Sequence, residues 1–450
     1  MLALTLAEIA AVVGGSVHGD PTLVVTGPAY VDSRRPEAAG LFVAVVGERV
    51  DGHEYAAGAH AVLGSRPTEA PTVVVADPVV ALGRLAGHVV RRLPATVLAL
   101  TGSQGKTGTK DYLAQVLAMA GPTVATAGSF NNELGLPLTV LGADADTRHL
   151  VLEMGARGIG HIAYLCEIAP PHIAAVINVG TAHVGEFGSR EAIALAKGEI
   201  VEALPEDGVA VLNADDELVA AMADRTHARL LRFGSDAEVT TRSVEVDDLS
   251  RPTFEIGHDG AWHPVRLRQS GLHQVQNALA AATMAIAAGV PVDRVAAALS
   301  EAEPASPMRM ELHERGDGLL VINDAYNANP ASMTAALGAL RTIGERRGRR
   351  TVAVLGEMRE LGDSSTAGHH EVGETARTLG IDAVVVVGAA AAAIAEGYGD
   401  EAIVTAGRDE ALAWVRENVA GADVVLVKAS RGAALETIAD GLLEGGETTR

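Results

Sequence analysis

Apolar and polar residues alternate in two patterns through the middle of this chain. Short apolar runs, typical of buried strands, occur at residues 96–100, 149–152, 173–179 and 209–212. Between such runs the apolar residues recur three or four positions apart, as on one face of a helix, for example at 107–119 and 189–203. Strands that alternate with helices in this way predict a largely parallel, doubly wound sheet.

The last third of the chain repeats this alternation after an interruption. In segment 235–270 single polar and apolar residues alternate, which predicts an antiparallel excursion before an Ala-rich helix at 275–288. Apolar runs, each followed by Gly and a helical pattern, then return at 351–355, 383–387 and 424–427, and the Ala run at 389–393 favours helix. A second doubly wound sheet is therefore expected.

The beginning of the chain has a weaker pattern, with two short β-like runs at 43–46 and 72–76 between clusters of Gly, Asp and Pro. Thr5 and Glu8 have the spacing of a helix capping box, so we expect a first helix there rather than a signal peptide. A chain of 450 residues is too long for one ordinary core. We predict an α/β protein of three domains: a small α/β domain at 1–95, a central doubly wound domain at 96–306, and a Rossmann-like domain at 307–450.

Composition narrows the class of partner. The chain has 57 Asp and Glu against 35 Lys and Arg, a formal net charge of −22 with His neutral. A protein that binds nucleic acid or a membrane surface needs a broad basic face, so we expect neither partner. Apart from Ala-rich stretches that we interpret as buried elements, no apolar run reaches about 18 residues without a charge or a turn, so we expect no membrane span.

The single cysteine, Cys166, excludes an internal disulfide and a thiolate metal cluster. It lies in the apolar stretch 162–168, which predicts a packed core thiol rather than a nucleophile. A reducing cytosol is the natural setting of such a chain, and we expect a cytoplasmic monomer.

The strongest single signal is Thr101-Gly102-Ser103-Gln104-Gly105-Lys106-Thr107, between a predicted strand and a predicted helix. A turn in this place directs backbone N–H groups and the positive end of the helix at phosphate oxygens. Lys106 would reach the terminal phosphates, and the Thr107 hydroxyl could ligate Mg²⁺. The turn is a shortened phosphate-binding loop, because Leu100 stands where the usual loop has its first Gly. The alternative is an incidental Gly-rich turn.

Two further predicted strands end next to groups that could bind a metal. Glu153 ends the run at 149–152, and the carboxyl ends of parallel strands meet at the edge that holds the phosphate turn. A magnesium nucleotide needs oxygen ligands near its phosphates, so Glu153 is a candidate ligand, with a solvated strand end as the alternative. His183 follows the run at 173–179 and is a second candidate, although a single loop histidine is more often structural.

Together these segments resemble the Mur ligase family, whose members form amide bonds in peptidoglycan precursor synthesis. The resemblance rests on the order and spacing of segments across nearly the whole chain: TGSQGKT at 101–107, Asn131-Asn132-Glu133, Glu153, NVGTAHVGEFGS at 178–189, AKGEI at 196–200, GLHQVQN at 271–277, Arg309, DAYNANP at 324–330 and KASRG at 428–432. Gly108 departs from the family, where Thr or Ser is common, but Thr107 keeps its hydroxyl and we expect little loss.

The resemblance implies a ligase that uses ATP and Mg²⁺, with Lys106 acting on the phosphates. By its residue type alone Lys197 would be a surface lysine; the resemblance implies that it is carbamoylated and helps hold a second Mg²⁺ with Glu153 and His183. It also implies nucleotide contacts from both sides of a seam between the second and third domains, at Gly102, Ser103, Gln104, Gly105, Lys106, Thr107, Gly108, Asn131, His273, Asn277, Arg309, Asp324, Tyr326, Asn327 and Asn329. Without the resemblance, His273 and Asn277 could equally be helix caps.

Three segments favour, within the family, the addition of D-alanyl-D-alanine to a UDP-N-acetylmuramoyl-tripeptide: Asp32-Ser33-Arg34 with GERVDGH at 47–53, DAYNANPASM at 324–333, and LGEMRELGDSS at 355–365. The implied substrate contacts are Ser33 and Arg34 for the uridine diphosphate, and Asn132, Lys428 and Arg431. Ordinary loop or strand-end chemistry is the alternative for such residues.

Other reactions stay open. A ligase that adds a diamino acid would be expected to carry Asp-Asn-Pro-Arg, but Ala331 follows Asn329-Pro330 here. A folate polyglutamylating enzyme fits the N-terminal segments less well. A nucleotide switch that makes no bond is the alternative from another class.

Overall fold

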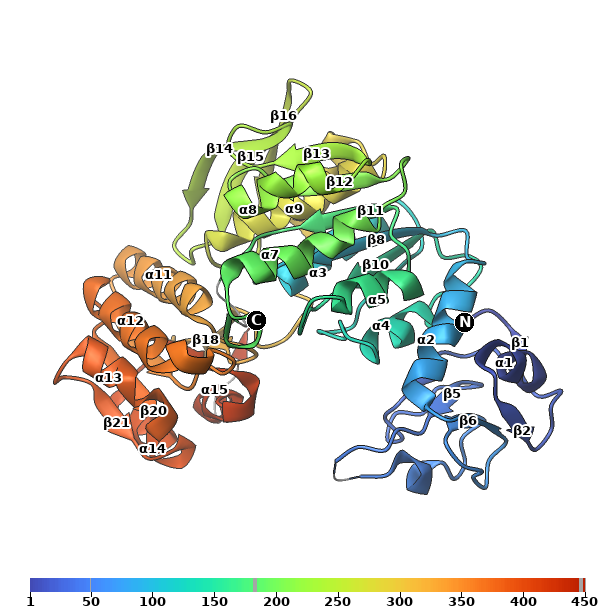
Figure 1. The fold of residues 1–450 in the computed structure, drawn as a ribbon. Helices are drawn as coiled ribbons and strands as arrows, with labels where there is room; N and C mark the ends of the chain where they lie inside the picture. The colour runs from blue at the N-terminus through green and yellow to red at the C-terminus, as the bar shows by residue number, and fades with distance from the viewer. Residues whose placement is uncertain (49, 181–183, 445–447, 450) are drawn as a thin grey trace.

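The computed structural model describes every residue of the chain except 49, 181–183, 445–447 and 450. Each of its three large sheets takes its strands from one continuous part of the chain. In Figure 1 the blue N-terminal part and the orange C-terminal part flank the green and yellow central part. The predicted α/β class is confirmed, and the three domain limits stay a prediction.

The N-terminal part begins with the predicted capping box. The N–H of Glu8 donates to Thr5 Oγ1 at 3.2 Å and the N–H of Thr5 donates to Glu8 at 2.7 Å, which starts α1 (Leu6–Val13). The part ends with α2 (Pro78–Val90). Its five-stranded sheet has the order β2 (Ser16–His18), β7 (Thr72–Val74), β6 (Ala61–Gly64), β5 (Leu41–Val43) and β4 (Ala29–Tyr30), and β1 (Leu4–Thr5) pairs with β3 (Val24–Val25).

The central sheet has nine strands, parallel from β9 to β13. Its order is β16 (Ala261–Arg266), β15 (Pro252–His258), β14 (Val239–Val246), β13 (Arg229–Phe233), β12 (Val209–Asn213), β11 (Ile173–Val176), β8 (Thr96–Thr101), β10 (His149–Glu153) and β9 (Thr123–Ala125). Strands β14, β15 and β16 pair antiparallel, which confirms the excursion predicted for segment 235–270.

Helices cover both faces of the central sheet. Leu98 and Leu100 pack on one face with α3 (Lys106–Ala118), α9 (His273–Ala287) and α10 (Val292–Glu301). Val97 and Ala99 pack on the other face with α4 (Gly135–Val140), α5 (His161–Ile168) and α7 (Arg190–Glu202). This alternation is what a doubly wound sheet requires. Two short helices, α6 (Val184–Phe187) and α8 (Glu217–Ala220), complete the part.

The C-terminal sheet repeats the design. Its order is β21 (Ile403–Thr405), β20 (Ala383–Val387), β19 (Arg350–Leu355), β22 (Asp423–Lys428), β18 (Leu320–Asp324), β17 (Glu311–Arg315) and β23 (Thr448–Thr449), parallel from β21 to β18. Its helices are α11 (Pro330–Arg347), α12 (Ser365–Thr378), α13 (Ala392–Tyr398), α14 (Arg408–Asn418) and α15 (Glu436–Leu443). The second predicted doubly wound sheet is therefore confirmed.

Several element limits differ from the prediction, three of them for reasons that the structure shows. The strand predicted at 43–46 is β5 and ends at Val43, because the Val45 N–H donates to the Val43 carbonyl and turns the chain. The run 173–179 leaves its ladder after Val176, next to the end of β8. The Ala run at 389–393 begins as a 3₁₀ turn, and α13 starts only at Ala392. Apolar runs therefore predict which segments are buried, but they do not predict the residue at which a strand or helix begins or ends.

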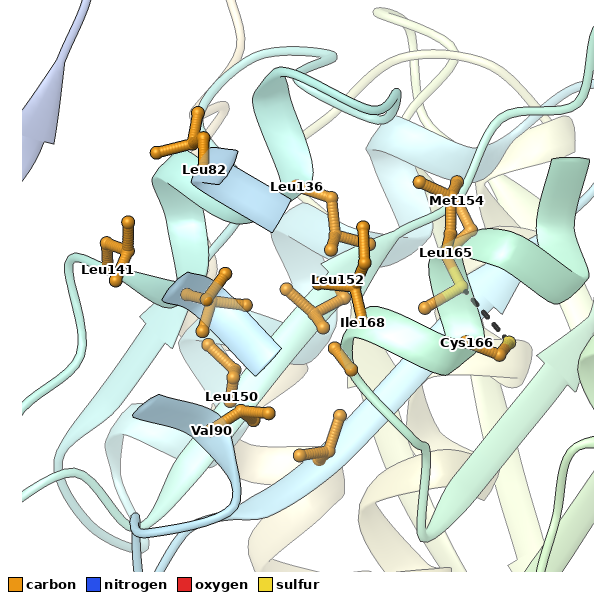
Figure 2. Packing of buried hydrophobic residues seen from close by; sticks show 14 of the residues in the cluster. Leu82, Val90, Leu136, Leu141, Leu150, Leu152, Met154, Leu165, Cys166 and Ile168 are labelled. Atoms are coloured by element: carbon orange, nitrogen blue, oxygen red, sulfur yellow. Dashed lines mark hydrogen bonds between the residues drawn. The ribbon is translucent and has the colours of Figure 1, made fainter. Parts of the chain in front are cut away.

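One hydrophobic core joins the N-terminal part to the central sheet. Figure 2 shows Leu82 and Val90 of α2 packed against side chains of α4, α5 and β10. Cys166 lies in this core 3.7 Å from the Met154 sulfur, and burial raises the pKa of its thiol to about 12, which confirms a packed thiol. The two cores of the C-terminal part, in contrast, take their buried members only from residues 310–442. Across the described ranges no helix is long and apolar enough to span a membrane.

Candidate active site

The predicted phosphate turn joins β8 to α3. Gly105 is the residue before α3 and has φ 78°, a left-handed conformation that glycine adopts without strain. Asn178, just beyond β11, accepts the N–H groups of Ser103 and Gln104, both at 3.0 Å, and so fixes the front of the turn. No hydrogen bond joins the next three N–H groups, those of Gly105, Lys106 and Thr107, to another described residue. The turn therefore has donors for an anion at the positive end of α3.

Asn277 of α9 lies directly on this turn. Its side-chain N–H donates to Gln274 at 2.9 Å, which fixes the amide, and a Cβ on Gly105 would overlap its Oδ1. A Cβ on Gly108 would lie 3.0 Å from its Nδ2. The glycine that departs from the family at 108 therefore stands where α9 comes closest to the first turn of α3.

Glu153 lies beside the turn, as predicted from the end of its strand. It is opposite Leu100 in the ladder between β10 and β8 and is 1% exposed. Its carboxylate accepts the Thr107 hydroxyl at 2.9 Å and the Asn131 amide at 2.7 Å. The predicted metal ligands Thr107 and Glu153 are thus in direct contact.

Two lysines, the partly buried Lys106 and the buried Lys197, line the same cavity. Lys106 donates from Nζ to the Gly102 carbonyl at 2.6 Å, and burial lowers its pKa, while Glu153 and Glu360 raise it. Lys197 of α7 is 3% exposed. Burial, and then the charge of Lys106, hold the pKa of Lys197 well below its usual value. Its amine is therefore neutral over a wider pH range than an ordinary lysine.

The C-terminal part supplies the opposite wall. Arg309 lies over the Tyr326 ring, 4.3 Å from its centroid, and the Tyr326 hydroxyl bonds to Ser129 of the central part. Lys428, 2% exposed at the end of β22, donates to Asp324 at 2.6 Å. Lys428 also donates to the Asn327 carbonyl at 3.0 Å, so both of its acceptors in this structure belong to the C-terminal part.

These side chains enclose one cavity of about 430 Å³. Of the predicted residues, it is lined by Ser103, Gln104, Gly105, Lys106, Thr107, Gly108, Asn131, Asn132, Glu153, Lys197, His273, Asn277, Arg309, Asp324, Tyr326, Asn327, Asn329, Lys428 and Arg431. His273 begins α9, and its buried Nδ1 has no hydrogen-bond partner in the part of the chain that the structure describes. Burial lowers the pKa of His273, so the ring is neutral and can donate to or accept from a base.

Several predicted residues also have structural contacts. Asn132 caps α4 through the Gly135 N–H at 2.9 Å, and Asn329 caps α11 through the Ser332 N–H at 2.9 Å. Arg431 pairs with Glu436 at 2.5 Å. Gly102, whose carbonyl holds Lys106, is not among the lining residues.

Two groups of predicted residues lie apart from the cavity or outside the description. Arg34 pairs with Asp32 at 2.8 Å on the surface of the N-terminal part, and that pairing lowers the pKa of Asp32 to about 2. Neither Arg34 nor its neighbour Ser33 lines the cavity, and their role stays a prediction. His183 lies outside the described residues.

Sequence reasoning missed several residues that line the cavity: Asp111, Ser129, Arg157, His161, Asn178, Gln274 and Glu360. Asn178, Gln274 and Glu360 fall inside segments that carried the resemblance, so a signal was present. Asp111 pairs with its neighbour Lys110, and both side chains are nearly buried. The spacing of polar residues along α3 does not predict which of them turns inward.

Comparisons with known proteins match most of the chain. Two family models match: the Mur ligase middle domain over residues 100–285, and the Mur ligase glutamate ligase domain over residues 308–431. The UDP-N-acetylmuramoyl-tripeptide–D-alanyl-D-alanine ligase of Mycobacterium tuberculosis (strain H37Rv) is 45% identical, with 98% of each chain covered. The ligase of that name from Escherichia coli (strain K12) is 36% identical over 99% of this chain and 100% of its own.

Solved structures show the same likeness. A crystal structure of MurF from Acinetobacter baumannii has a TM-score of 0.88 and 33% identity, covering 98% of this chain and 99% of its own. The crystal structure of MurF ligase from Thermotoga maritima in complex with ADP has a TM-score of 0.80 and 30% identity, covering 93% and 98%. The matches extend through all three parts of the chain.

Proposed function

The chain belongs to the Mur ligase family, and from this premise we propose that it is an ATP-dependent ligase that joins D-alanyl-D-alanine to UDP-N-acetylmuramoyl-tripeptide in peptidoglycan precursor synthesis. The observation that carries the proposal is the single cavity lined by Lys106, Thr107 and Glu153 of the central part and by Arg309 and Lys428 of the C-terminal part. Full-length relatives that bear this ligase name, and a similar structure that holds ADP, support the choice of reaction and nucleotide.

ATP fits the cavity by the chemistry of its walls. Its phosphates would lie on the N–H groups at the start of α3, with Lys106 and Arg309 opposing their charge. His273 and Asn277, both at the start of α9, would present hydrogen-bonding groups to the base. Asp324, Tyr326, Asn327 and Asn329 would contact the ribose or phosphates from the C-terminal side.

Mg²⁺ fits beside the phosphates, at the contact between Thr107 and Glu153. Within the described ranges no three His, Cys, Asp or Glu residues form a metal-binding group alone, so phosphate and water oxygens would supply the other ligands. Bound Mg²⁺ would offset negative charge on the transferring phosphoryl group. His183 is proposed as a further ligand from the family resemblance, although it lies outside the described residues.

Lys197 would become a carbamate. A neutral amine attacks CO₂, the new N–C bond forms, and a proton leaves, which converts a cation into a carboxylate-like group. The lowered pKa of Lys197 favours the neutral amine, and its position on the cavity wall suits an oxygen ligand for a second Mg²⁺. This role is proposed by the family resemblance and supported by burial.

The reaction would proceed in two transfers. A carboxylate oxygen of the tripeptide attacks the γ-phosphorus in line, the bond to the β-phosphate oxygen breaks, and ADP and an acyl phosphate form. The uncharged amine of D-alanyl-D-alanine then attacks the acyl carbon, and phosphate leaves as the amide forms and the amine gives up its proton. Lys106 and Arg309 would stabilise charge on the phosphoryl oxygens, and closer approach of the two cavity walls would keep water from the acyl phosphate.

The substrates other than ATP would be bound by residues from all three parts of the chain. Ser33 and Arg34 are the proposed contacts for the uridine diphosphate, and Asn132, Lys428 and Arg431 for the peptide and dipeptide carboxylates. Residues 1–95, 96–306 and 307–450 would accordingly serve as precursor-binding, ATPase and ligase domains. We also propose that the enzyme works in the cytoplasm, where ATP is available, and as a monomer, because one chain supplies both sides of the cavity.

Release of phosphate from ATP tests the proposal, with the UDP-linked tripeptide and D-alanyl-D-alanine each omitted in turn. We expect turnover only when both are present, and none in Lys106→Met. Turnover that persists without either partner would favour a nucleotide switch. Turnover with a UDP-linked dipeptide and a diamino acid would instead assign the preceding reaction of the family.

A further inference from the structure

Arg225 binds the side of the helix that carries Lys197. It ends the 3₁₀ turn η2 (Ala221–Arg225), and its side chain is 21% exposed. The guanidinium donates to the Ala194 carbonyl at 3.0 Å and to the Leu195 carbonyl at 2.8 Å. Its Nε donates to Glu202 at 2.8 Å. One arginine therefore holds α7 at points that span about two turns.

The guanidinium can lie this close only because residue 198 is glycine. A Cβ built on Gly198 would overlap the Nη1 and Cζ atoms of Arg225. Glycine is less favourable than alanine inside a helix, so helix propensity does not account for it. Gly338 in α11 is a contrasting case, since a Cβ there would meet nothing within 4 Å.

A second side of α7 is held from another direction. Glu199 accepts the N–H groups of Gly160 at 2.5 Å and Ala163 at 3.0 Å, and so caps the start of α5. With 3.6 residues per turn, neighbouring helical residues point about 100° apart. The contacts at Gly198 and Glu199 therefore hold α7 from two sides and fix its rotation about its axis. That rotation determines where the Lys197 side chain points.

The Lys197 amine does not hold itself in place. It lines the cavity, and no hydrogen bond or ion pair joins it to another described residue. The position of such a side chain depends on the backbone that carries it. The contact of Arg225 with Gly198, the next residue along the helix, is one of the contacts that fix that backbone, together with the packing of Ala196 in the core.

We propose that Arg225 is a positioning residue of this ligase and that Gly198 is the gap that admits it. Together they hold α7 so that the Lys197 amine, and the carbamate proposed on it, face Lys106 and the metal side of the cavity. The inference rests on the proposed function, because the carbamate is the group that needs the position. Arg225 does not line the cavity itself.

The test compares Arg225→Ala, Arg225→Lys, Gly198→Ala and the Arg225→Ala/Gly198→Ala double variant with two matched controls. Arg341→Ala removes an arginine of α11 that donates to Glu345 and to the Gly380 carbonyl just beyond α12, and Gly338→Ala adds a methyl group to α11 in open space. The carbamate is read directly by ¹³C NMR after equilibration with ¹³C-bicarbonate. The kcat, the KM for ATP and the melting temperature are measured on the same full-length proteins.

We expect Arg225→Ala and Gly198→Ala each to lower kcat between about 10- and 100-fold, with the KM for ATP unchanged. The carbamate signal should fall with kcat, and excess bicarbonate should restore part of both. The kcat of Arg225→Lys should lie between those of Arg225→Ala and the wild type. The kcat of the double variant should be no lower than that of the less active single variant, because both substitutions remove the same contact. The two controls should match the wild type in kcat and carbamate.

The proposal is overturned if Arg225→Ala and Gly198→Ala keep the wild-type kcat and carbamate signal, whatever happens to the melting temperature. Arg225 would then be a structural contact only. If instead the wild type shows no carbamate and Lys197→Met keeps its activity, the proposed role of Lys197 itself fails. That second result separates an error in the proposed function from an error in the clamp.

Discussion

Replacing Gly105 by alanine should damage nucleotide binding while leaving most of the fold unchanged. Gly105 has φ 78° at the residue that turns β8 into α3. An L-residue in this conformation is strained, and its methyl group would also overlap Oδ1 of Asn277. Asn277 cannot retreat freely, because its amide donates to Gln274 at 2.9 Å.

The magnitude follows from two costs. Left-handed backbone costs an L-residue about 1–2 kcal/mol. Displacing Asn277 would break its bond to Gln274, a loss of about 0.5–1.5 kcal/mol. Without nucleotide the altered turn can relax, so binding must restore the strained form and both costs enter the binding free energy. A total of about 1.5–3.5 kcal/mol weakens ADP binding roughly 10- to 400-fold.

Calorimetric titration with ADP measures this directly. Gly260→Ala is the matched control, because Gly260 has nearly the same φ, 79°, in the turn between β15 and β16 and open space around it. It should bind ADP like the wild type. If Gly105→Ala binds ADP within about threefold of the wild type, the reasoning from strain and overlap is wrong.

Four further outcomes can be checked. Thr107→Val should lower kcat on the order of 100-fold while Thr107→Ser keeps most of it, as steady-state phosphate release would show. Lys428→Met leaves the Asp324 carboxylate, 13% exposed, without its cation, and should destabilise the C-terminal part by about 3 kcal/mol in denaturant titration. The Cys166 thiol, with a pKa near 12, should resist alkylation at neutral pH until the protein unfolds, as mass spectrometry would detect. Burial lowers the pKa of Lys197, so between the lowered pKa and the ordinary lysine pKa the unfolded chain binds more protons at this residue than the folded chain. As the pH falls through that range, the melting temperature of the wild type should therefore fall relative to that of Lys197→Met.

Much of the fold could be predicted because its signals are local. The run before Thr101, the Gly-rich turn and the helical spacing after Lys106 each reflect a backbone preference that a few residues express. The position of Glu153 also followed from a general rule, since the ends of parallel strands share one edge. Those arguments located the centre of the cavity without any knowledge of distant contacts.

The remaining site residues depend on contacts between segments far apart in the chain. The sequence around Gly105 and Gly108 does not predict that Asn277 will contact them. The sequence around Gly198 likewise does not predict its contact with Arg225. Packing of this kind depends on how whole helices settle on a sheet, which residue spacing does not specify. The family resemblance, rather than periodicity, brought His273 and Arg309 to the same place as the turn.

The core that joins the N-terminal part to the central sheet has a mechanical consequence (Figure 2). Because the first two parts share a core, we expect them to stay fixed relative to each other, and we expect any domain movement to involve the last part, whose buried core residues lie within 310–442. With the uridine end anchored at Ser33 and Arg34 as proposed, the span from there to Lys106 stays constant through turnover. On this arrangement we expect the enzyme to select the peptide stem by its length, because a stem one residue short would not bring its carboxylate to the γ-phosphate even with the uridine end bound.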